Sequence, residues 1–370
     1  MTTDRSAEAQ HYARLKRWLW LADVGLTLVW CWLAQAAGWS HAWAGWAEAT
    51  SASRWMSVAL YGVVFGVLFY LVGLPLHYYS SFLVEHRFHL SNQTPQQWVW
   101  RECKQALVAA LLGLLFLEGL YFCIGVAPFH WWFLLAVGWW VVTIVLARIL
   151  PTVIIPLFYR CVPLDDATLR QTLLQLSQQV RVPVMDAFRI DLSRDTKKAN
   201  AAVVGWGKTR RVLLADTLLG HFTSEEVTAV VAHELGHHRL HHIPVHLVAS
   251  LVTTTAGFWL LAQWARGALP AGVQDLALWP SLTIALTVLS VVLMPLHNGL
   301  SRSLERQADA FALRVTQAPQ AFVATMRKLA VQNLAELQPP WWVEWWFYSH
   351  PAIARRIQMA ERYSGGAVQN

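Results

Sequence analysis

The sequence predicts a mainly α-helical protein that crosses a membrane several times and carries a smaller polar region with a short β-sheet. Three observations lead to this fold class. Only 14% of the 370 residues are charged, whereas about a quarter is usual in soluble domains. Six apolar segments are about long enough to cross a hydrocarbon core as helices. The 22 tryptophans suit a chain that meets membrane–water boundaries, where indole rings concentrate.

The six expected membrane helices lie at residues 18–37, 55–76, 106–126, 131–150, 244–264 and 276–296. The first segment has a signal peptide as its alternative, because the A-Q-A triplet at 34–36 resembles a cleavage site, but its long apolar body favours a retained helix. Asp23, Glu118 and Arg148 lie within apolar segments. Such residues face the interior of a helix bundle, extend to the membrane interface or line a water-filled cavity, and the sequence leaves these alternatives open.

Basic residues predict the orientation in the membrane. If the N-terminus faces the cytoplasm and six helices alternate, all of the 29 Lys and Arg residues except Arg54 and Arg266 fall on the cytoplasmic side. This asymmetry follows the positive-inside rule. We therefore expect both termini and both long polar stretches in the cytoplasm and the lipid bilayer as a partner. The net charge of +7 is explained by topology, and no basic run with interleaved aromatics indicates nucleic acid.

The chain divides into four expected regions. They are four N-terminal membrane helices, a cytosolic region with a small sheet, two further membrane helices and a cytosolic helical region, at 1–159, 160–242, 243–297 and 298–370. Within the second region, periodicity predicts an amphipathic helix followed by three short strands, at 164–182, 184–192, 201–206 and 210–216. Thr223 and Glu226 have the spacing of a capping box, which starts the next helix, and Pro244 should end or kink it.

That helix carries His233, Glu234 and His237 in the spacing H-E-x-x-H. Residues four apart share a helical face, so the two imidazoles can bind one zinc ion while the glutamate handles water. The four cysteines include no C-x-x-C pair, so a metal must be held by histidine and carboxylate. A catalytic zinc needs a third protein ligand and an open position for water.

A second polar face could supply the third ligand. Asn298, Arg302, Glu305 and Asp309 are spaced 4, 3 and 4 residues apart, which lines one side of a helix. The alternative is an ordinary solvated stripe of an amphipathic helix. This polar face is expected on the same side of the membrane as H-E-x-x-H, which favours a shared site.

Five stretches, in chain order, carry a resemblance to a known family. They are 78–94, 154–166, 199–219 with the H-E-x-x-H that follows, 300–312 and 346–357. Over nearly its whole length the chain resembles the zinc-dependent CAAX prenyl proteases of type I, which are integral-membrane metalloendopeptidases. The resemblance implies peptide hydrolysis by metal-activated water, with one zinc ion per chain and a peptide substrate that is prenylated or membrane-embedded.

The resemblance also implies roles for individual residues. His233, His237 and Glu305 would be the zinc ligands, and Glu234 the general base. Asp309 would hydrogen-bond a ligating imidazole.

The remaining implied roles concern the substrate. His350, in the His-Pro position, would stabilise the oxyanion. Arg302 and Asn298 match family positions near the site, and we expect Arg302 to be catalytic and Asn298 to bind substrate. Asn200, Ala201 and Gly205 belong to a strand that would pair with the substrate backbone, so we expect them to bind substrate as well. The other histidines, His238, His241, His242 and His246, are expected to be polar helix or interface residues.

Several departures from the family leave the substrate open. This chain has Ala202 where many members have tyrosine, and it shows six membrane helices without the insertions of members that have seven. A broad-specificity protease for membrane-protein quality control is therefore an alternative with the same chemistry, and a divalent-metal transporter is a further one. The expected location is the inner membrane in a bacterium, or the endoplasmic reticulum or inner nuclear membrane in a eukaryote.

Overall fold

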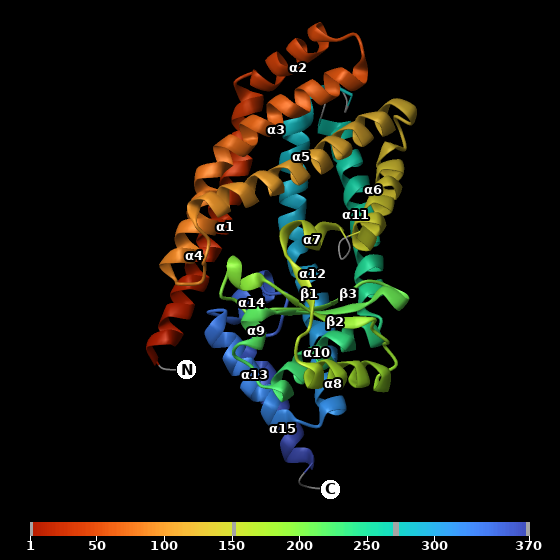
Figure 1. Cartoon of the computed structure of the whole chain (residues 1–370). Helices are drawn as coiled ribbons and strands as arrows, with labels where there is room; N and C mark the ends of the chain where they lie inside the picture. The colour runs from red at the N-terminus through yellow and green to blue at the C-terminus, as the bar shows by residue number, and fades with distance from the viewer. Residues whose placement is uncertain (1–2, 150–152, 269–273, 368–370) are drawn as a thin grey trace.

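The computed structural model describes residues 3–149, 153–268 and 274–367, which form a long helical bundle with one small sheet at its end (Figure 1). Residue 150, the last of the expected fourth membrane segment, lies outside the described residues. The longer helices are α1 (Thr3–Ala36), α2 (Trp39–Thr50), α3 (Arg54–Tyr78), α5 (Pro95–Val126), α6 (Trp131–Ile149), α8 (Ala167–Gln179), α10 (Ser224–Arg239), α11 (His242–Ala268), α12 (Trp279–Thr316), α13 (Pro319–Gln332) and α15 (Ile353–Ala367). The short ones are α4 (Val84–Arg87), α7 (Ile155–Phe158), α9 (Asp216–Leu219) and α14 (Trp341–Phe347).

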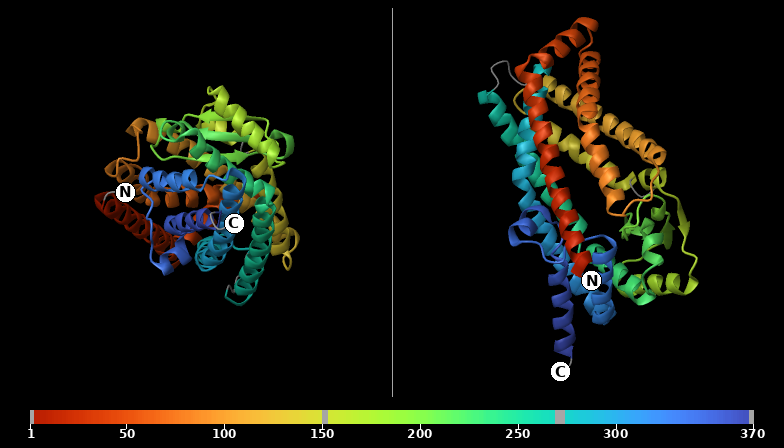
Figure 2. Two further views of the ribbon diagram at one scale, coloured as in Figure 1. Left: turned by 90° about the horizontal axis from the view of Figure 1, so that it is seen from below. Right: turned by 90° about the vertical axis from the view of Figure 1, so that its left-hand side faces the viewer.

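Six helical segments in the described part of the chain are long and apolar enough to cross a membrane, and each expected segment overlaps one of them. They are Arg5–Ala36, Arg54–Arg87, Pro95–Val126, Trp131–Ile149, His242–Gly267 and Leu276–Thr316. The N-terminus and the C-terminus both lie toward the end that holds the sheet (Figures 1 and 2). This agrees with an even number of crossings, while the compartment that this end faces stays a prediction.

Helix α2, which the sequence did not predict, closes the end of the bundle away from the sheet (Figure 1). The Ser40 hydroxyl is fully buried, donates to the carbonyl of Ala277 at 2.7 Å and contacts the Tyr61 hydroxyl at 2.8 Å. Ala44 and Ala47 pack into the same apolar cluster. The small residues of α2 thus allow its close contact with α3 and with the short turn Leu276–Leu278 that precedes α12.

The sheet contains four strands in the order β1-β2-β4-β3, where the sequence predicted three. Their bounds are β1 (Cys161–Pro163), β2 (Asp186–Ile190), β3 (Ala201–Val204) and β4 (Arg211–Ala215). β2 and β4 are parallel, and the outer strands β1 and β3 run antiparallel to their neighbours. β1 has only three residues, too few to show an alternating pattern. Because β3 comes last in the strand order, it is an edge strand, and no other strand of the described residues pairs with its outer side.

One apolar core joins the sheet to the surrounding helices. Leu173 of α8, Leu214 of β4, Val231 of α10 and Phe322 of α13 are at most 1% exposed and belong to one cluster. Thr223 caps α10 through the expected capping box with Glu226. The core therefore fixes α10, which carries H-E-x-x-H, against the sheet on one side and α13 on the other.

Helices α11 and α12 both run from a membrane-capable segment to the region of H-E-x-x-H. α12 is one continuous helix of 38 residues, so the expected limit at 297/298 divides a single element. A residue with positive φ, His241 (φ 59°), separates α10 from α11, and Pro244 lies in the first turn of α11, where proline is tolerated. We predicted that Pro244 would end or kink the helix, and α10 ends at Arg239, five residues before the proline.

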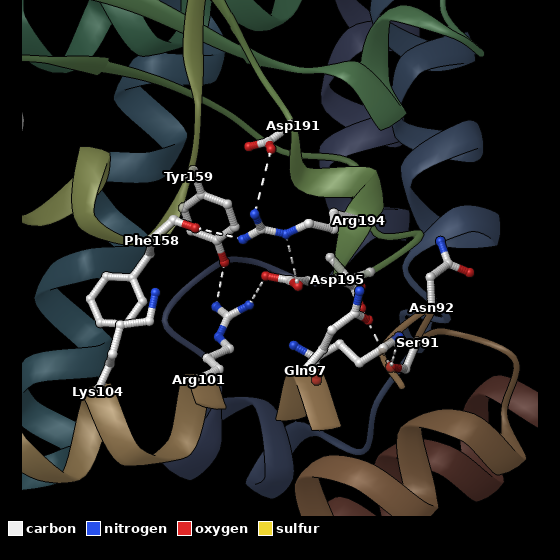
Figure 3. Close-up of polar contacts among 12 residues, drawn as sticks. Ser91, Asn92, Gln97, Arg101, Lys104, Phe158, Tyr159, Asp191, Arg194 and Asp195 are labelled. Atoms are coloured by element: carbon white, nitrogen blue, oxygen red, sulfur yellow. Dashed lines mark hydrogen bonds and ion pairs between the residues drawn. The ribbon is translucent and has the colours of Figure 1, made fainter. Parts of the chain in front are cut away.

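A polar network attaches the loop before β3 to the membrane helix α5 (Figure 3). Arg101 of α5 bonds the Asp195 carboxylate and the Tyr159 hydroxyl. Arg194 donates to the carbonyl of Phe158 at 2.8 Å and lies 3.8 Å from the Asp191 carboxylate. The loop that leads into β3 is therefore held by residues from the membrane bundle.

Candidate active site

His233, His237 and Glu305 come together where α10 packs on α12. One ligand atom from each lies within 4.8 Å of the others. His233 Nε2 is 3.2 Å from His237 Nε2 and 3.2 Å from Glu305 Oε2, and His237 Nε2 is 3.4 Å from Glu305 Oε1. His233 and Glu305 are buried, and His237 is half-buried. The two distant sequence motifs thus form one group of metal-binding atoms.

This group fits zinc in geometry and in chemistry. Ligand atoms about 2.0–2.1 Å from a tetrahedral zinc lie about 3.3–3.4 Å from each other. The two Nε2 atoms are 3.2 Å apart, and they lie 3.2 and 3.4 Å from the Oε2 and Oε1 atoms of Glu305, respectively. Glu305 Oε2 is buried and, among the described residues, has no partner with hydrogen-bond geometry. Such an atom is placed to bind a cation. Two imidazoles and a carboxylate also form a known ligand set of catalytic zinc, with a fourth position left for water.

Close packing of α10 on α12 depends on Gly236, the glycine inside H-E-L-G-H. A Cβ atom at this position would lie 3.1 Å from Cδ1 of Phe311 and 3.4 Å from Cα of Ala308. A side chain here would push against α12. The glycine therefore lets the carboxylate of Glu305 reach both histidines.

Asp309 lies one turn beyond Glu305 and contacts the other nitrogen of a candidate ligand. Its Oδ1 is 2.8 Å from Nδ1 of His233. Arg356 of α15 donates two hydrogen bonds to the same carboxylate, at 2.8 and 2.6 Å. Burial alone would lower the pKa of His233, but the carboxylates of Asp309 and Glu305 outweigh it and raise the pKa to about 9. Arg356 was not among the residues that we predicted for the site.

His242 contacts the second candidate ligand in the same way. Its Nδ1 lies 3.0 Å from Nδ1 of His237, and its side chain is 1% exposed. The expectation that His242 belongs only to the surroundings was therefore incomplete. Burial and the charge of His233 lower the pKa of His237 to about 4. Because the break at His241 changes the helical phase, spacing alone did not place His242 beside His237.

Glu234 faces a small cavity beside the edge strand β3. The cavity has a volume of about 220 Å³. It is lined by Asn200, Ala201, His233, Glu234, His350 and Arg356, together with apolar residues of α10 and α13. Burial raises the pKa of Glu234. A carboxyl group with raised pKa beside the candidate metal ligands suits proton transfer.

His350 approaches the ligand group from the loop between α14 and α15. Its Nε2 lies 3.3 Å from Glu305 Oε1, and its side chain is 58% exposed. Partial loss of water around the ring lowers the pKa of His350, although the Glu305 carboxylate opposes this. The imidazole therefore borders both the ligand group and the open cavity.

Arg302 and Asn298 contact α14, and within the described part of the chain none of their hydrogen bonds goes to the three candidate ligands. Nη1 of Arg302 donates to the carbonyls of Glu344, Trp345 and Tyr348. Nδ2 of Asn298 donates to the carbonyl of Trp346 at 2.5 Å. We expected Arg302 to be catalytic and Asn298 to bind substrate, whereas these contacts indicate that both position the segment before His350.

Of the three expected residues around β3, Ala201 lies in the strand, Asn200 directly precedes it and Gly205 directly follows it. Asn200 and Ala201 line the cavity with Glu234. Gly205 ends β3 with φ +100°, and a Cβ there would lie 2.6 Å from the carbonyl oxygen of Thr209. The turn after β3 therefore requires glycine at position 205. His238, expected to be a polar helix or interface residue, contacts the carbonyl of Val203 at 3.0 Å and so connects α10 to the edge strand.

The fold and the site define an integral-membrane zinc metalloprotease, and sequence comparison identifies its family. Residues 163–364 match the model of peptidase family M48. Residues 1–160 match the model described as CAAX prenyl protease N-terminal, five membrane helices. The chain therefore belongs to peptidase family M48. In residues 1–160 this chain has four of the membrane-capable segments, and the short helix α2 lies between the first two.

Relatives and a solved structure agree with this assignment. The chain is 27% identical to an uncharacterized metalloprotease, YhfN, of Bacillus subtilis over 98% of this chain and 87% of the relative. It is 30% identical to CAAX prenyl protease 1 of Saccharomyces cerevisiae, over 78% of this chain and 68% of the relative. The crystal structure of S. mikatae Ste24p superposes with a TM-score of 0.84 at 25% identity, covering 97% of this chain and 89% of that one. The family assignment leaves the transporter alternative without support.

Proposed function

We propose that this metalloprotease uses one zinc ion per chain, held by His233, His237 and Glu305. The observation that carries the proposal is the convergence of their three ligand atoms within 4.8 Å. When bound, zinc acts as a Lewis acid that polarises the scissile carbonyl and lowers the pKa of water. Asp309 and His242 orient the two imidazoles through their Nδ1 atoms.

Glu234 is the general base in this proposal. Its neighbour His233 binds the metal, and its carboxylate lines the cavity where the scissile bond would lie. The carboxylate takes the proton of the attacking water and then gives it to the nitrogen of the leaving amine. Burial raises the pKa of Glu234 toward neutral pH, and a pKa near the working pH favours both accepting and returning the proton.

The free side of β3 would bind the substrate as an added strand. Ala215 N donates to Asn200 O, and β3 pairs antiparallel with β4 from this point on. Backbone groups of an antiparallel strand alternate in direction, so those of Ala201 and Val203 point away from β4. The carbonyl of Val203 already contacts His238. Ala201, next to the cavity, is therefore the first position for a substrate hydrogen bond.

His350 would stabilise the oxyanion that forms on the substrate carbonyl. Its Nε2 lies on the cavity side of Glu305, at 3.3 Å from Oε1, and can donate a hydrogen bond toward the reacting carbon. Loss of one such donor costs about 3 kcal/mol in the activation free energy. Arg302 donates to the carbonyl of Tyr348, two residues before His350, and so helps to hold this imidazole in place.

The substrate class that we propose is a peptide with a prenylated C-terminal CAAX sequence, cleaved at the cytoplasmic face. Relatives from rice and yeast carry the name CAAX prenyl protease 1. The distribution of Lys and Arg supports a cytoplasmic location of both termini. The inner membrane is the proposed compartment if the host is a bacterium, and the endoplasmic reticulum or inner nuclear membrane if it is a eukaryote. Unprenylated membrane proteins are the alternative substrates.

The test uses zinc-loaded protein in liposomes with a farnesylated CAAX peptide and the same peptide without the farnesyl group. Glu234→Gln should abolish cleavage and retain zinc, while Glu225→Gln, an exposed change on the same helix, should leave both unchanged. Faster cleavage of the farnesylated peptide supports the proposed substrate class. Equal rates favour the broader protease, and wild-type cleavage by Glu234→Gln would show that the general base is assigned wrongly.

A further inference from the structure

Helix α14 exposes three tryptophans on one face. Trp341, Trp342 and Trp345 are 73%, 53% and 48% exposed, whereas Val343 and Glu344 are buried. At about 100° per residue the three indoles fall within an arc of about 100°. A face of this size and composition is uncommon on a surface that contacts water alone.

The opposite side of α14 is fixed to the protein. Arg302 and Asn298 of α12 bind its backbone carbonyls. The carboxylate of Glu344 accepts from the backbone N–H of Ala352 at 3.2 Å and pairs with Arg355 at 3.3 Å. These contacts hold α14 and the loop with His350 as one unit, and they direct the tryptophan face outward.

The contacts of α14 also show its height relative to the membrane. Asn298 is two residues, or about 3 Å of helix rise, beyond Leu296, the last largely exposed apolar residue of the α12 span. Phe347, the last residue of α14, makes an edge-to-face contact with Trp20 of α1 at 5.5 Å. Trp20 lies two residues inside the first strongly exposed indole of that span, Trp18. Two membrane helices therefore place α14 at the end of their apolar spans.

Figure 1 agrees with this placement, since α14 lies beside α12 at the level where the long helices meet the sheet. Indole rings prefer the membrane–water boundary, where the ring is buried among lipids and its N–H stays hydrated. The lipid bilayer is thus the partner that both the height and the chemistry of this face fit. A partner protein would have to bind at the same boundary.

We propose that α14 is an interfacial anchor: Trp341, Trp342 and Trp345 insert among the lipid headgroups on the side of the membrane that holds the active site. The anchor fixes the depth of the α14–α15 loop, and with it His350, relative to the bilayer. A substrate that reaches the site from the membrane would then meet the imidazole at a constant height. The anchor itself does not depend on the proposed zinc chemistry.

The test measures the depth of a spin label on full-length protein in bilayers of phosphatidylcholine and phosphatidylglycerol. The four natural cysteines, Cys31, Cys103, Cys123 and Cys161, are replaced by alanine, and Trp342→Cys receives a nitroxide. We expect collisions with oxygen, which concentrates in lipid, to exceed those with water-soluble chromium oxalate. The label should lie within about 10 Å of the headgroup–acyl boundary.

Arg327→Cys supplies the control, because this side chain on α13 is 67% exposed and pairs only weakly with Glu361 at 3.9 Å. Its label should collide mainly with chromium oxalate. Equal accessibility of labels at 342 and 327 would overturn the anchor. Spin–spin broadening at 342 would also overturn it, because a second copy of the chain would then cover the face. If Trp342→Cys does not fold, Trp345→Cys probes the same face with the same outcomes.

Discussion

Oδ1 of Asp309 lies 2.8 Å from Nδ1 of His233, and Arg356 holds the same carboxylate with two hydrogen bonds. These contacts join α10, α12 and α15 behind the candidate metal centre. Asp309 is fully buried, so its charge depends on Arg356 for compensation.

Arg356→Met should lower the free energy of unfolding by about 3–5 kcal/mol, because it leaves the Asp309 carboxylate buried without its cation. Asp309→Asn combined with Arg356→Met should regain part of that stability, since the buried charge is removed. Zinc affinity of the double variant should still be about 10–100-fold weaker, because His233 loses the carboxylate that orients it. Denaturation in detergent and chelator competition measure the two effects. A single variant as stable as the wild type would contradict this reading of the pair.

His242 should act on zinc through His237. His242→Leu removes the partner of His237 Nδ1 and should weaken zinc binding about 10–100-fold. His242→Asn can place an amide oxygen near the former Nδ1 position and should recover most of the affinity. Chelator competition distinguishes the variants. Equal losses in both would mean that His242 fills space and does not orient His237.

Gly236→Ala should destabilise the protein by about 1–3 kcal/mol and weaken zinc binding, because its Cβ would meet Phe311 at 3.1 Å. Phe311→Leu in the same chain should restore zinc binding, since the smaller side chain makes room. Gly113→Ala is the matched control, because a Cβ there meets nothing within 4 Å. Melting temperature and zinc content are the measurements. Wild-type zinc affinity in Gly236→Ala would show that the close approach of the helices is dispensable.

Zinc affinity should increase with pH. The pKa of His233 is raised to about 9, so below this pH the protein stripped of metal carries a proton there that zinc must displace. The pKa of His237 is lowered to about 4, so this ligand is already neutral at pH 5. Apparent affinity should thus rise about tenfold per pH unit from pH 5 to pH 9 and level off above. Isothermal titration at several pH values tests the slope, and an affinity independent of pH would contradict it.

Much of the fold and of the candidate metal centre could be predicted from periodicity and spacing. Apolar segments of sufficient length located all six membrane-capable helices, and the i, i+4 spacing of His233 and His237 placed both imidazoles on one face. Glu305 was found by asking which polar helix face could supply a third ligand. In each case the information lies within one helix.

Contacts between elements were harder to predict. Arg356 reaches Asp309 across 47 residues, and Arg302 turned out to bind the backbone of α14 rather than face the reaction. No periodicity signals such pairs, because they depend on how α12, α14 and α15 pack. The three-residue strand β1 and the short helix α2 also gave no readable pattern.

Zinc content in wild-type protein and in Glu305→Gln tests the central claim most directly. Both are purified in mild detergent, beside Glu361→Gln, an exposed change on α15, and are analysed by elemental analysis after checking that they are folded. The account predicts about one zinc per chain in the wild type and in Glu361→Gln, and a marked loss in Glu305→Gln. A folded wild type that binds no zinc, or a Glu305→Gln protein that keeps it, would contradict the proposed metal centre.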